Sequence, residues 1–270
     1  AGQINEKYKS ELVAASIPFE EGGHTEDKVL AANLIVKSPG IPEKAPIMQK
    51  VASRNISVID EIEFAFKHTD AKIIAITGTN GKTTTTLLTY HLMKEAGKNV
   101  GLAGNVGFSM ARQVAEKNFD WYVLEVSSFQ LDGIEAFKPE IAVLLNITPD
   151  HLDRYDYNMQ NYVNSKFQLV ENMTPQEHFV YYADDDVIAR EIATRSIVPE
   201  KIPVSLKRPK SGRVYFDGDE MVFELKESFN IAQSDTTLKG PHNLINTMAA
   251  VTSVYLAGVG VNDIRKALKT

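Results

Sequence analysis

A glycine-rich turn that carries a lysine and threonines lies between an apolar run and a segment with helical character. The turn is Gly-Thr-Asn-Gly-Lys-Thr at residues 78–83, the apolar run is 72–77, and a helix is expected at 83–96. In such a context the backbone N–H groups of the turn and the helix N-terminus converge on an anion. Lys82 would bridge the β- and γ-phosphates of a nucleotide, and Thr83 would offer its hydroxyl to Mg²⁺. We predict ATP binding by a loop shorter than the usual G-x-x-x-x-G-K-[ST], against the alternative of a surface turn.

Glu125 stands inside an otherwise apolar strand, WYVLEV, at residues 121–126. A buried carboxylate needs a cation or hydrogen-bond donors, and a metal at the carboxyl edge of a parallel sheet would supply the cation. After the next such strand, at 141–147, the loop 146–154 gathers polar and ionisable residues that include His151. We expect the two strands to be neighbours, so that Glu125 and His151 face one Mg²⁺ beside the glycine-rich turn. The alternative for Glu125 is a strand-end side chain that reaches solvent.

Two other charged features carry little functional information by themselves. Asp184, Asp185 and Asp186 precede a helical segment, where acidic residues cap free amides and complement the helix dipole. Lys166 lies in the segment 161–167, which has the pattern of an amphipathic helix. An exposed lysine is common on such a helix. The residues alone therefore predict helix caps and a surface lysine.

The apolar runs that precede the polar loops are typical of strands buried on both faces of a parallel sheet. Helical segments separate these runs, and a strand–helix pair that begins at residue 179 continues the alternation. This order predicts an α/β fold with a mostly parallel sheet. The other elements expected in this part are a hairpin around Asp217-Gly218-Asp219 within 214–224 and helices at 242–257 and 262–268.

A smaller α/β unit is expected ahead of the glycine-rich turn. It would consist of a strand at 31–36, a turn at 38–40, a helix at 48–54, a strand at 56–59 and a helix at 61–67. We place the boundary near residues 69–71. The chain would then divide into a domain at 1–70 and a larger domain at 71–270.

Composition restricts the classes of protein to which the chain can belong. Its 270 residues are 43% apolar and 24% charged, as in ordinary globular proteins of one large or two smaller domains. The formal net charge of -6 gives no electrostatic footprint for nucleic acid, and no apolar run of about 18 residues offers a membrane span. There is no cysteine for a disulfide or a thiolate metal site, and no apolar segment typical of a signal peptide. We expect small-molecule partners and a cytoplasmic location.

Five motifs occur in order between Thr77 and Asn246, namely TGTNGKTTTT, EVSSFQLD, NITPDHLDRY, YVNSK and GPHNLIN. In their order and spacing these motifs resemble those of the Mur ligases. The stretches EVSSFQL and DHLDRY resemble the members that add D-glutamate, rather than those that add L-alanine, diaminopimelate or lysine, or D-Ala-D-Ala. Folylpolyglutamate synthases have a related glycine-rich loop, but its usual sequence is glycine-lysine-glycine-serine.

The resemblance implies an ATP-dependent, ADP-forming ligase that joins D-glutamate to UDP-N-acetylmuramoyl-L-alanine during peptidoglycan precursor synthesis. ATP would phosphorylate the alanyl carboxylate, which is otherwise a poor electrophile. The amine of D-glutamate would attack the acyl phosphate, and the tetrahedral intermediate would expel phosphate. The family pattern further implies an incomplete, Rossmann-like N-terminal domain for the UDP substrate at 1–70, and a P-loop, ATPase-like central domain at 71–270.

The family pattern also assigns roles to individual residues. It makes Lys166 a lysine that CO₂ carbamylates, which turns a cation into a carboxylate-like anion able to orient a metal. The implied catalytic residues are Lys82, Glu125, His151 and Lys166. Two Mg²⁺ sites are implied, with ligands among Thr83, Glu125, His151 and carbamylated Lys166. The implied ATP contacts are Gly78, Thr79, Asn80, Gly81, Lys82, Thr83 and Thr84, with Asn243 and Asn246 at the adenine. The implied substrate contacts are Ser38, Gly40, Asn105, Ser127, Gln130 and His151.

Two departures from the family pattern concern the ends of the chain. Ahead of residue 31 there is no glycine-rich loop for the UDP group, and Ser38 to Ile41 would be what is left of a substrate loop. The chain also stops about where the family's third domain, which binds D-glutamate, would begin. We expect a fragment that does not turn over alone, and a monomer.

Two readings from other classes are kept open by the residues. A P-loop phosphotransferase or GTPase would use Glu125 as a switch or Walker B acid and would form no amide bond. A non-catalytic nucleotide-binding module would keep the loop but lose the catalytic residues. The presence of Lys82, Glu125, His151 and Lys166 together argues against such a loss.

Overall fold

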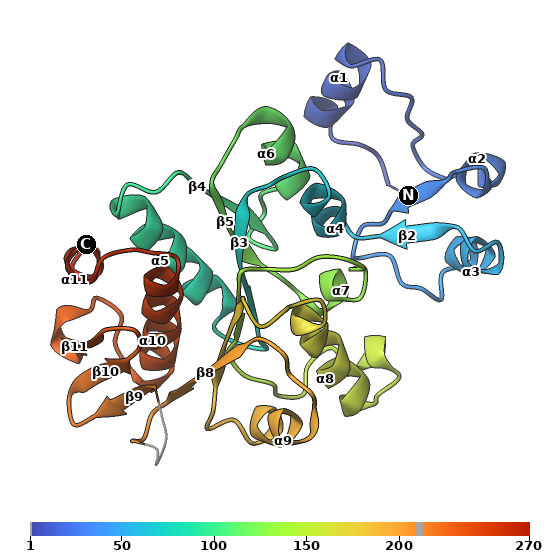
Figure 1. Cartoon of the computed structure of the whole chain (residues 1–270). Coiled ribbons are helices and arrows are strands. Elements are labelled where there is room, and N and C mark those ends of the chain that lie inside the picture. The colour runs from blue at the N-terminus through green and yellow to red at the C-terminus, as the bar shows by residue number, and fades with distance from the viewer. Residues whose placement is uncertain (1, 209–212) are drawn as a thin grey trace. The chain divides into compact units, whose positions relative to one another are not determined.

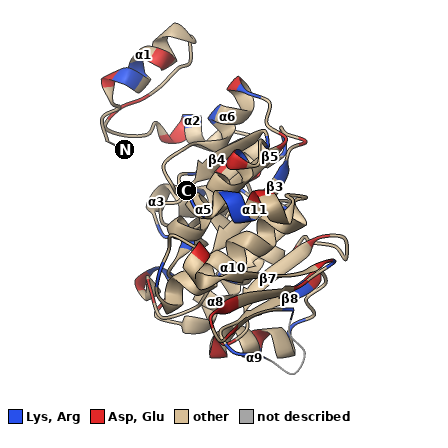
Figure 2. Ribbon diagram, turned by 90° about the vertical axis from the view of Figure 1, so that its left-hand side faces the viewer, with Lys and Arg blue, Asp and Glu red and all other residues tan. Residues whose placement is uncertain are grey.

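The computed structural model describes residues 2–208 and 213–270. The chain forms two compact units, Ala1–Ile59 and Asp60–Thr270, each of which is described by itself (Figure 1). Within the described residues, no helix is both long enough and apolar enough to cross a bilayer. Figure 2 shows that basic and acidic residues are interspersed along the elements it draws and are not gathered by sign.

The first unit contains a short parallel β-α-β arrangement. Strands β1 and β2 pair in parallel, with Leu34 opposite Ser57, and the chain passes between them through α3. The strand expected at 31–36 begins only at Leu34, because Ala31 still closes the last turn of α2 through its N–H bond to the Asp27 carbonyl. The bounds in this unit are α1 (Glu6–Ala14), α2 (Glu26–Leu30), β1 (Leu34–Val36), α3 (Pro46–Ser53) and β2 (Ser57–Ile59).

The division between the units falls after Ile59, earlier than the boundary expected between residues 70 and 71. The reason is that α4 (Glu61–Phe66) is tied to the second unit. The Asp60 N–H donates to the Gly133 carbonyl at 2.8 Å, and the Asp60 side chain caps α4. Glu63, which is fully buried, accepts the backbone N–H groups of residues 135–137. These bonds join segments too distant in sequence for a local pattern to reveal them.

The second unit is built on a nine-stranded sheet with the order β11-β10-β9-β8-β7-β6-β3-β5-β4 among the described residues. Strands from β4 to β9 pair in parallel, whereas β9, β10 and β11 are antiparallel. The predicted α/β fold with a mostly parallel sheet is confirmed, as is the hairpin around Gly218. The strands are β3 (Lys72–Thr77), β4 (Val100–Gly104), β5 (Trp121–Glu125), β6 (Ile141–Leu144), β7 (His178–Tyr182), β8 (Glu200–Ser205), β9 (Val214–Asp217), β10 (Glu220–Glu224) and β11 (Ser228–Ala232).

Helices cover both faces of this sheet (Figure 1). Alternate residues of β3 point to opposite sides, so Ile74 and Ile76 join one buried cluster and Ile73 joins another. The first cluster packs under α5, α10 and α11, and the second under α4, α6, α7, α8 and α9. Each fully buried aliphatic side chain contributes about 1.5–3 kcal/mol. The bounds are α5 (Lys82–Glu95), α6 (Met110–Glu116), α7 (Ser128–Leu131), α8 (Met159–Phe167), α9 (Asp186–Thr194), α10 (Pro241–Leu256) and α11 (Val261–Ala267).

Candidate active site at the carboxyl edge of the sheet

The glycine-rich loop, residues 78–81, leaves β3 and enters α5 in a conformation that needs its glycines. Gly78 and Gly81 have φ of 152° and 85°, values that residues with a side chain rarely adopt. Space is also restricted, since a Cβ on Gly81 would lie 2.5 Å from Oδ1 of Asn246, and one on Gly78 would lie 3.0 Å from Cβ of Leu145. The loop is therefore packed between α10 and the segment after β6.

Two N–H groups of this loop are used inside the protein. The Thr79 N–H donates to the Asn146 carbonyl at 2.9 Å, and the Asn80 N–H donates to Oδ1 of Asn146 at 2.8 Å. They were expected to face a phosphate. The N–H groups of residues 82–84, in the first turn of α5, have no partner within their own helix, and the cap Gly81 has no side chain to offer one. These are the groups that the geometry leaves for an anion.

Lys82 begins α5 and is folded over the loop. Its Nζ donates to the Thr79 carbonyl at 2.7 Å. Burial lowers the pKa of Lys82, while the negative charges of Glu125 and Asp150 oppose that shift. A cationic head group is thus placed directly over the turn, where it would meet the terminal phosphates of a nucleotide.

Glu125 ends β5 and is only 2% exposed, so the alternative of a side chain that reaches solvent is wrong. Both carboxylate oxygens are occupied. Oε2 accepts the Thr83 hydroxyl at 2.7 Å, and Oε1 accepts the Asn105 amide at 2.6 Å. A carboxylate and a threonine hydroxyl side by side at the end of a phosphate loop are ligands of the kind that Mg²⁺ takes alongside phosphate oxygens and water.

No group of three or more His, Cys, Asp and Glu side chains that could hold a metal occurs in the part of the chain that the structure describes. A Mg²⁺ ion is usually held by one or two protein groups together with substrate phosphates. The pair formed by Thr83 and Glu125 thus fits the predicted cofactor.

The expectation that the strands before Glu125 and His151 are neighbours is wrong. Strand β3 separates β5 from β6, so the strands that precede Glu125 and His151 are not neighbours. Sequence order does not disclose this insertion, because the chain crosses over between parallel strands. His151 is 57% exposed, with its ring 5.3 Å from that of Phe129 and its Nε2 3.6 Å from Asp150. Its backbone lies in the left-handed region, with φ of 49°.

Lys166 is not a surface residue, as the helical pattern alone had suggested. It is 2% exposed, its Nζ donates to the Gly78 carbonyl at 3.0 Å, and it lies 4.6 Å from the centre of the Tyr162 ring. Burial, with a smaller effect from the charge of Lys82, lowers the pKa of Lys166 to about 7. The neutral amine is therefore well populated near neutral pH.

The predicted adenine contacts lie at the start of α10. Nδ2 of Asn246 donates to Oδ1 of Asn243 at 3.3 Å, which shows that the two side chains share one face. Asn243 also donates to the Lys239 carbonyl at 2.8 Å. Because Asn246 adjoins Gly81, this face is placed beside the glycine-rich loop.

The predicted substrate residues have different surroundings. Ser127 and Gln130 form a capping box at the start of α7, so their side chains are bonded to each other and to the backbone. Asn105 is bonded to Glu125. Ser38 and Gly40 lie in the first unit, in a turn closed by a 3.0 Å bond from the Ile41 N–H to the Ser38 carbonyl.

Sequence reasoning missed three groups that shape this site. Asn146 and Thr148 hold the glycine-rich loop, the latter through a 3.0 Å bond from its N–H to the Thr79 hydroxyl. The Tyr162 hydroxyl lies 3.2 Å from the same Thr79 oxygen. Asn146 and Thr148 lie within the NITPDH motif, and Tyr162 begins YVNSK, so all three were inside recognised motifs. Nothing in their spacing indicated that they contact the loop.

Comparison with known proteins gives a consistent picture. Residues 76–254 match the model of the Mur ligase middle domain. The UDP-N-acetylmuramoylalanine–D-glutamate ligase of Bacteroides fragilis is 50% identical over 265 residues, which cover 98% of this chain and 60% of that protein. The protein of the same name from Cytophaga hutchinsonii is 46% identical over 274 residues, covering 100% of this chain and 61% of that protein. The chain thus spans about 60% of the length of these curated relatives.

Solved structures share the fold at low identity. That of a UDP-N-acetylmuramoyl-L-alanyl-D-glutamate–2,6-diaminopimelate ligase has a TM-score of 0.64 and 18% identity, covering 88% of this chain and 62% of that chain. The structure of a UDP-N-acetylmuramate:L-alanyl-gamma-D-glutamyl-meso-diaminopimelate ligase from Neisseria meningitides has a TM-score of 0.66 and 16% identity. The match covers 100% of this chain and 88% of that chain. Since the family model matches most of the chain and the fold agrees, this protein belongs to the Mur ligase family.

Proposed function

We propose that this chain is the nucleotide-binding part of a ligase that joins D-glutamate to UDP-N-acetylmuramoyl-L-alanine with hydrolysis of ATP to ADP and phosphate. The observation that carries the proposal is the cluster of Lys82, Thr83, Glu125 and Asn105 at the carboxyl edge of the sheet. The names of the relatives with 50% and 46% identity support the choice of D-glutamate. EVSSFQL and DHLDRY support the same choice from within the chain.

The chemistry needs a nucleotide whose γ-phosphate faces the alanyl carboxylate. The N–H groups of residues 82–84 would receive the phosphates, and the Lys82 ammonium would lie over the transferred group. Mg²⁺ bound by Thr83 and Glu125 would neutralise charge on the phosphates during transfer. Asn105, bonded to Glu125, would keep that carboxylate in place and face the substrate. Attack by the D-glutamate amine on the acyl phosphate then forms the amide and releases phosphate.

Lys166 is proposed to act as a carbamate. Its pKa of about 7, which results chiefly from burial, makes the neutral amine available to attack CO₂, and one proton is released as the N–C bond forms. The product is an anion close to the Lys82 cation, so the like-charge repulsion between two lysines becomes an attraction. With His151, this anion would complete a second Mg²⁺ site. A carbamate carbon signal in ¹³C NMR after addition of ¹³C-bicarbonate, absent from Lys166→Ala, would test this; no difference between the two would sink it.

The other assignments follow from the same reaction. Ser127, Gln130 and His151 would contact the muramoyl-alanine arm. Asn243 and Asn246 would bond adenine, with residues 78–84 around the phosphates. The first unit, with Ser38 and Gly40, would bind the UDP part of the substrate. We place the reaction in the cytoplasm, where ATP and nucleotide-linked precursors are available, and expect a monomer.

The test is ATP-dependent phosphate release with UDP-N-acetylmuramoyl-L-alanine, using a protein that extends over the full length of the relatives. D-Glutamate, L-alanine, L-lysine and meso-diaminopimelate are offered in parallel. We expect release with D-glutamate alone. Release with another of the four would keep the ligase chemistry and reject the choice of amino acid. No release with any, despite MgATP binding, would favour a phosphotransferase or a non-catalytic module.

A further inference from the structure

Asp185 has a second bond that its position before a helix does not require. One carboxylate oxygen, Oδ1, accepts the N–H groups of Val187 and Ile188 at 3.0 Å each and so caps α9. The other oxygen, Oδ2, accepts the N–H of Ile147 at 3.0 Å. Residue 147 follows β6 and is 38 positions away. A cap alone needs only one oxygen, so the second bond joins α9 to the segment after β6.

Ile147 lies between the two residues that hold the glycine-rich loop. On one side, Asn146 bonds with Thr79 and Asn80, and on the other, the N–H of Thr148 donates to the Thr79 hydroxyl. The segment 146–148 therefore forms one wall of the loop, and the N–H at its centre is fixed by a charged acceptor. A charge-assisted bond of this kind is about twice as strong as a neutral one.

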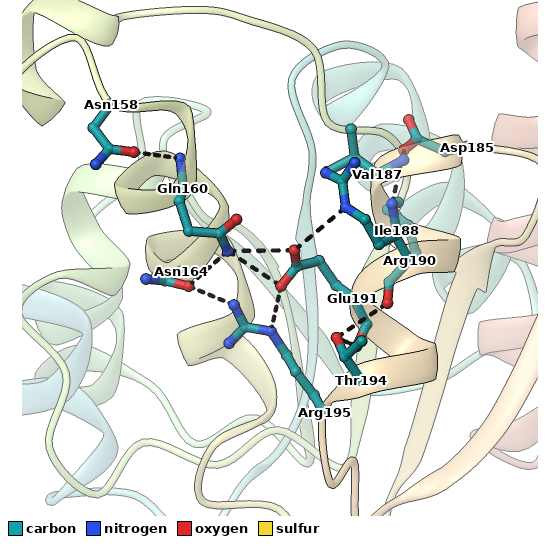
Figure 3. Close-up of polar contacts among 10 residues, drawn as sticks. All are labelled: Asn158, Gln160, Asn164, Asp185, Val187, Ile188, Arg190, Glu191, Thr194 and Arg195. Atoms are coloured by element: carbon teal, nitrogen blue, oxygen red, sulfur yellow. Dashed lines mark hydrogen bonds and ion pairs between the residues drawn. The ribbon is translucent and has the colours of Figure 1, made fainter.

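The helix that carries Asp185 is itself clamped against α8 (Figure 3). Glu191 of α9 is 7% exposed and accepts from Nε2 of Gln160 at 3.3 Å and from Nε of Arg195 at 2.7 Å. Arg195 in turn bonds to Oδ1 of Asn164 in α8 and packs over the Phe167 ring. Figure 3 shows the side chains of Gln160 and Asn164 pointing toward those of Glu191 and Arg195. Asp185 is thus held by an anchored element.

We propose that Asp185 is a positioning residue for the nucleotide site. Through the Ile147 N–H it holds segment 146–148 in place, and this segment sets the glycine-rich loop in the shape that receives phosphate before the nucleotide arrives. The role rests on the proposed binding of ATP at that loop. Both carboxylate oxygens of Asp185 accept backbone N–H groups of the protein, so its effect would be exerted through the segment it holds.

The test compares Asp185→Asn with Asp184→Asn. Asparagine caps helices as well as aspartate does, so the bonds to Val187 and Ile188 survive, but its amide group cannot accept from Ile147. Asp184 is a matched control, because its carboxylate accepts from the Ser205 hydroxyl and the Leu206 N–H at the end of β8, away from the loop. The dissociation constant of MgATP is measured by calorimetry, and hydrogen exchange of the Ile147 amide by NMR.

We expect Asp185→Asn to weaken MgATP binding by about 10-fold and to speed exchange at Ile147, because one hydrogen bond to a charged group is lost. Asp184→Asn should leave both within about twofold of the original. Equal MgATP affinities for the original chain and Asp185→Asn would overturn the positioning role, as would equal weakening by the two variants. If the unaltered chain fails to bind MgATP, the proposed function fails instead. Should Asp185→Asn not fold, Asp185→Ser, which also caps helices but has a single oxygen, replaces it.

Discussion

At the scale of single residues, the candidate site contains the buried amine of Lys166, whose charge depends on pH. Lys166 is enclosed by α8, the glycine-rich loop and the Tyr162 ring, and its Nζ has one carbonyl acceptor, that of Gly78. A cation is unfavourable in this position, and the pKa of Lys166 is therefore lowered. Burial makes the largest contribution to this shift, and the charge of Lys82 makes the next largest. The same enclosure that makes the charged lysine costly makes the neutral amine available for reaction with CO₂.

This pKa has a consequence for stability. In the folded chain the pKa of Lys166 is about 7, whereas in the unfolded chain it is near the ordinary value of about 10.4. Between these values the unfolded chain binds more protons, so stability rises with pH in that window. Relative to Lys166→Met, the unaltered chain should gain on the order of 4 kcal/mol between pH 7 and about pH 10.5.

The measurement is urea unfolding of both chains at several pH values in CO₂-free buffer. Lys166→Met removes the titrating amine and keeps most of the side-chain volume, so the difference between the two chains reports the titration of Lys166 together with its electrostatic effect on Lys82. Parallel stability profiles across this pH range would mean that Lys166 has an ordinary pKa in the folded chain.

At the scale of elements, the short helix α4 holds neighbouring segments of the second unit through the carboxylates of Glu61 and Glu63. Helix α4 holds residues 135–137 through Glu63, and Glu61 of the same helix accepts from the Ser109 hydroxyl and the Ala111 N–H at the start of α6. The loop between β4 and α6 carries Asn105, which contacts Glu125. Helix α4 is thus linked, by way of the start of α6, to the loop that contacts Glu125.

Replacement of Glu63 by Gln tests how much this helix contributes. Glu63 is 0% exposed, and its oxygens accept from the N–H groups of Glu135, Ala136 and Phe137 at 2.8 to 3.1 Å. Glutamine has one acceptor oxygen in place of two and no charge, so we expect a loss of about 2–4 kcal/mol in the free energy of unfolding.

Glu116→Gln is the control, because Glu116 forms an exposed pair with Arg112 within α6. Loss of this ion pair should change the free energy of unfolding by no more than about 0.5 kcal/mol. Both are measured by urea unfolding at neutral pH. Similar effects of the two substitutions would show that the three amide bonds of Glu63 contribute little.

At the scale of the whole molecule, the proposed nucleotide site and both buried clusters belong to the second unit. Every residue of the two clusters lies between Ile62 and Leu268. The groups around the glycine-rich loop also come from this unit. The second unit therefore contains the buried core that it needs to fold. It also contains the residues that are proposed to face the nucleotide.

A shortened chain of residues 60–270 should fold cooperatively and bind MgATP within about twofold of the complete chain, since no residue of the proposed ATP site is removed. A chain of residues 71–270, which begins at the boundary expected from sequence, loses α4 and the Glu63 bonds. It should be less stable by about 2 kcal/mol or more. Thermal unfolding and calorimetry of both chains decide this. Equal stability of the two would place α4 outside the folding unit.

The sequence by itself determined the features that depend on neighbouring residues. Strand, glycine-rich turn and helix follow one another along the chain, so the loop at 78–83 and its attachment to β3 and α5 were predictable from local pattern. The same holds for the hairpin at Gly218, the capping role of Asp185 and the shared face of Asn243 and Asn246. The roles of individual residues rest on the resemblance to Mur-type motifs and stay predictions.

Only the tertiary structure decided what depends on contacts between distant segments. Strand β3 lies between β5, which ends at Glu125, and β6, which precedes His151. Lys166 is buried, whereas the helical pattern had predicted a surface residue. In the tertiary structure the N–H groups of Thr79 and Asn80 donate to Asn146, and the N–H of Ile147 donates to Asp185. Parallel strands are joined by crossovers whose order local pattern does not encode. For that reason the glycine-rich loop and the helix caps could be predicted from sequence, whereas the pairings, charges and supports of the candidate site could not.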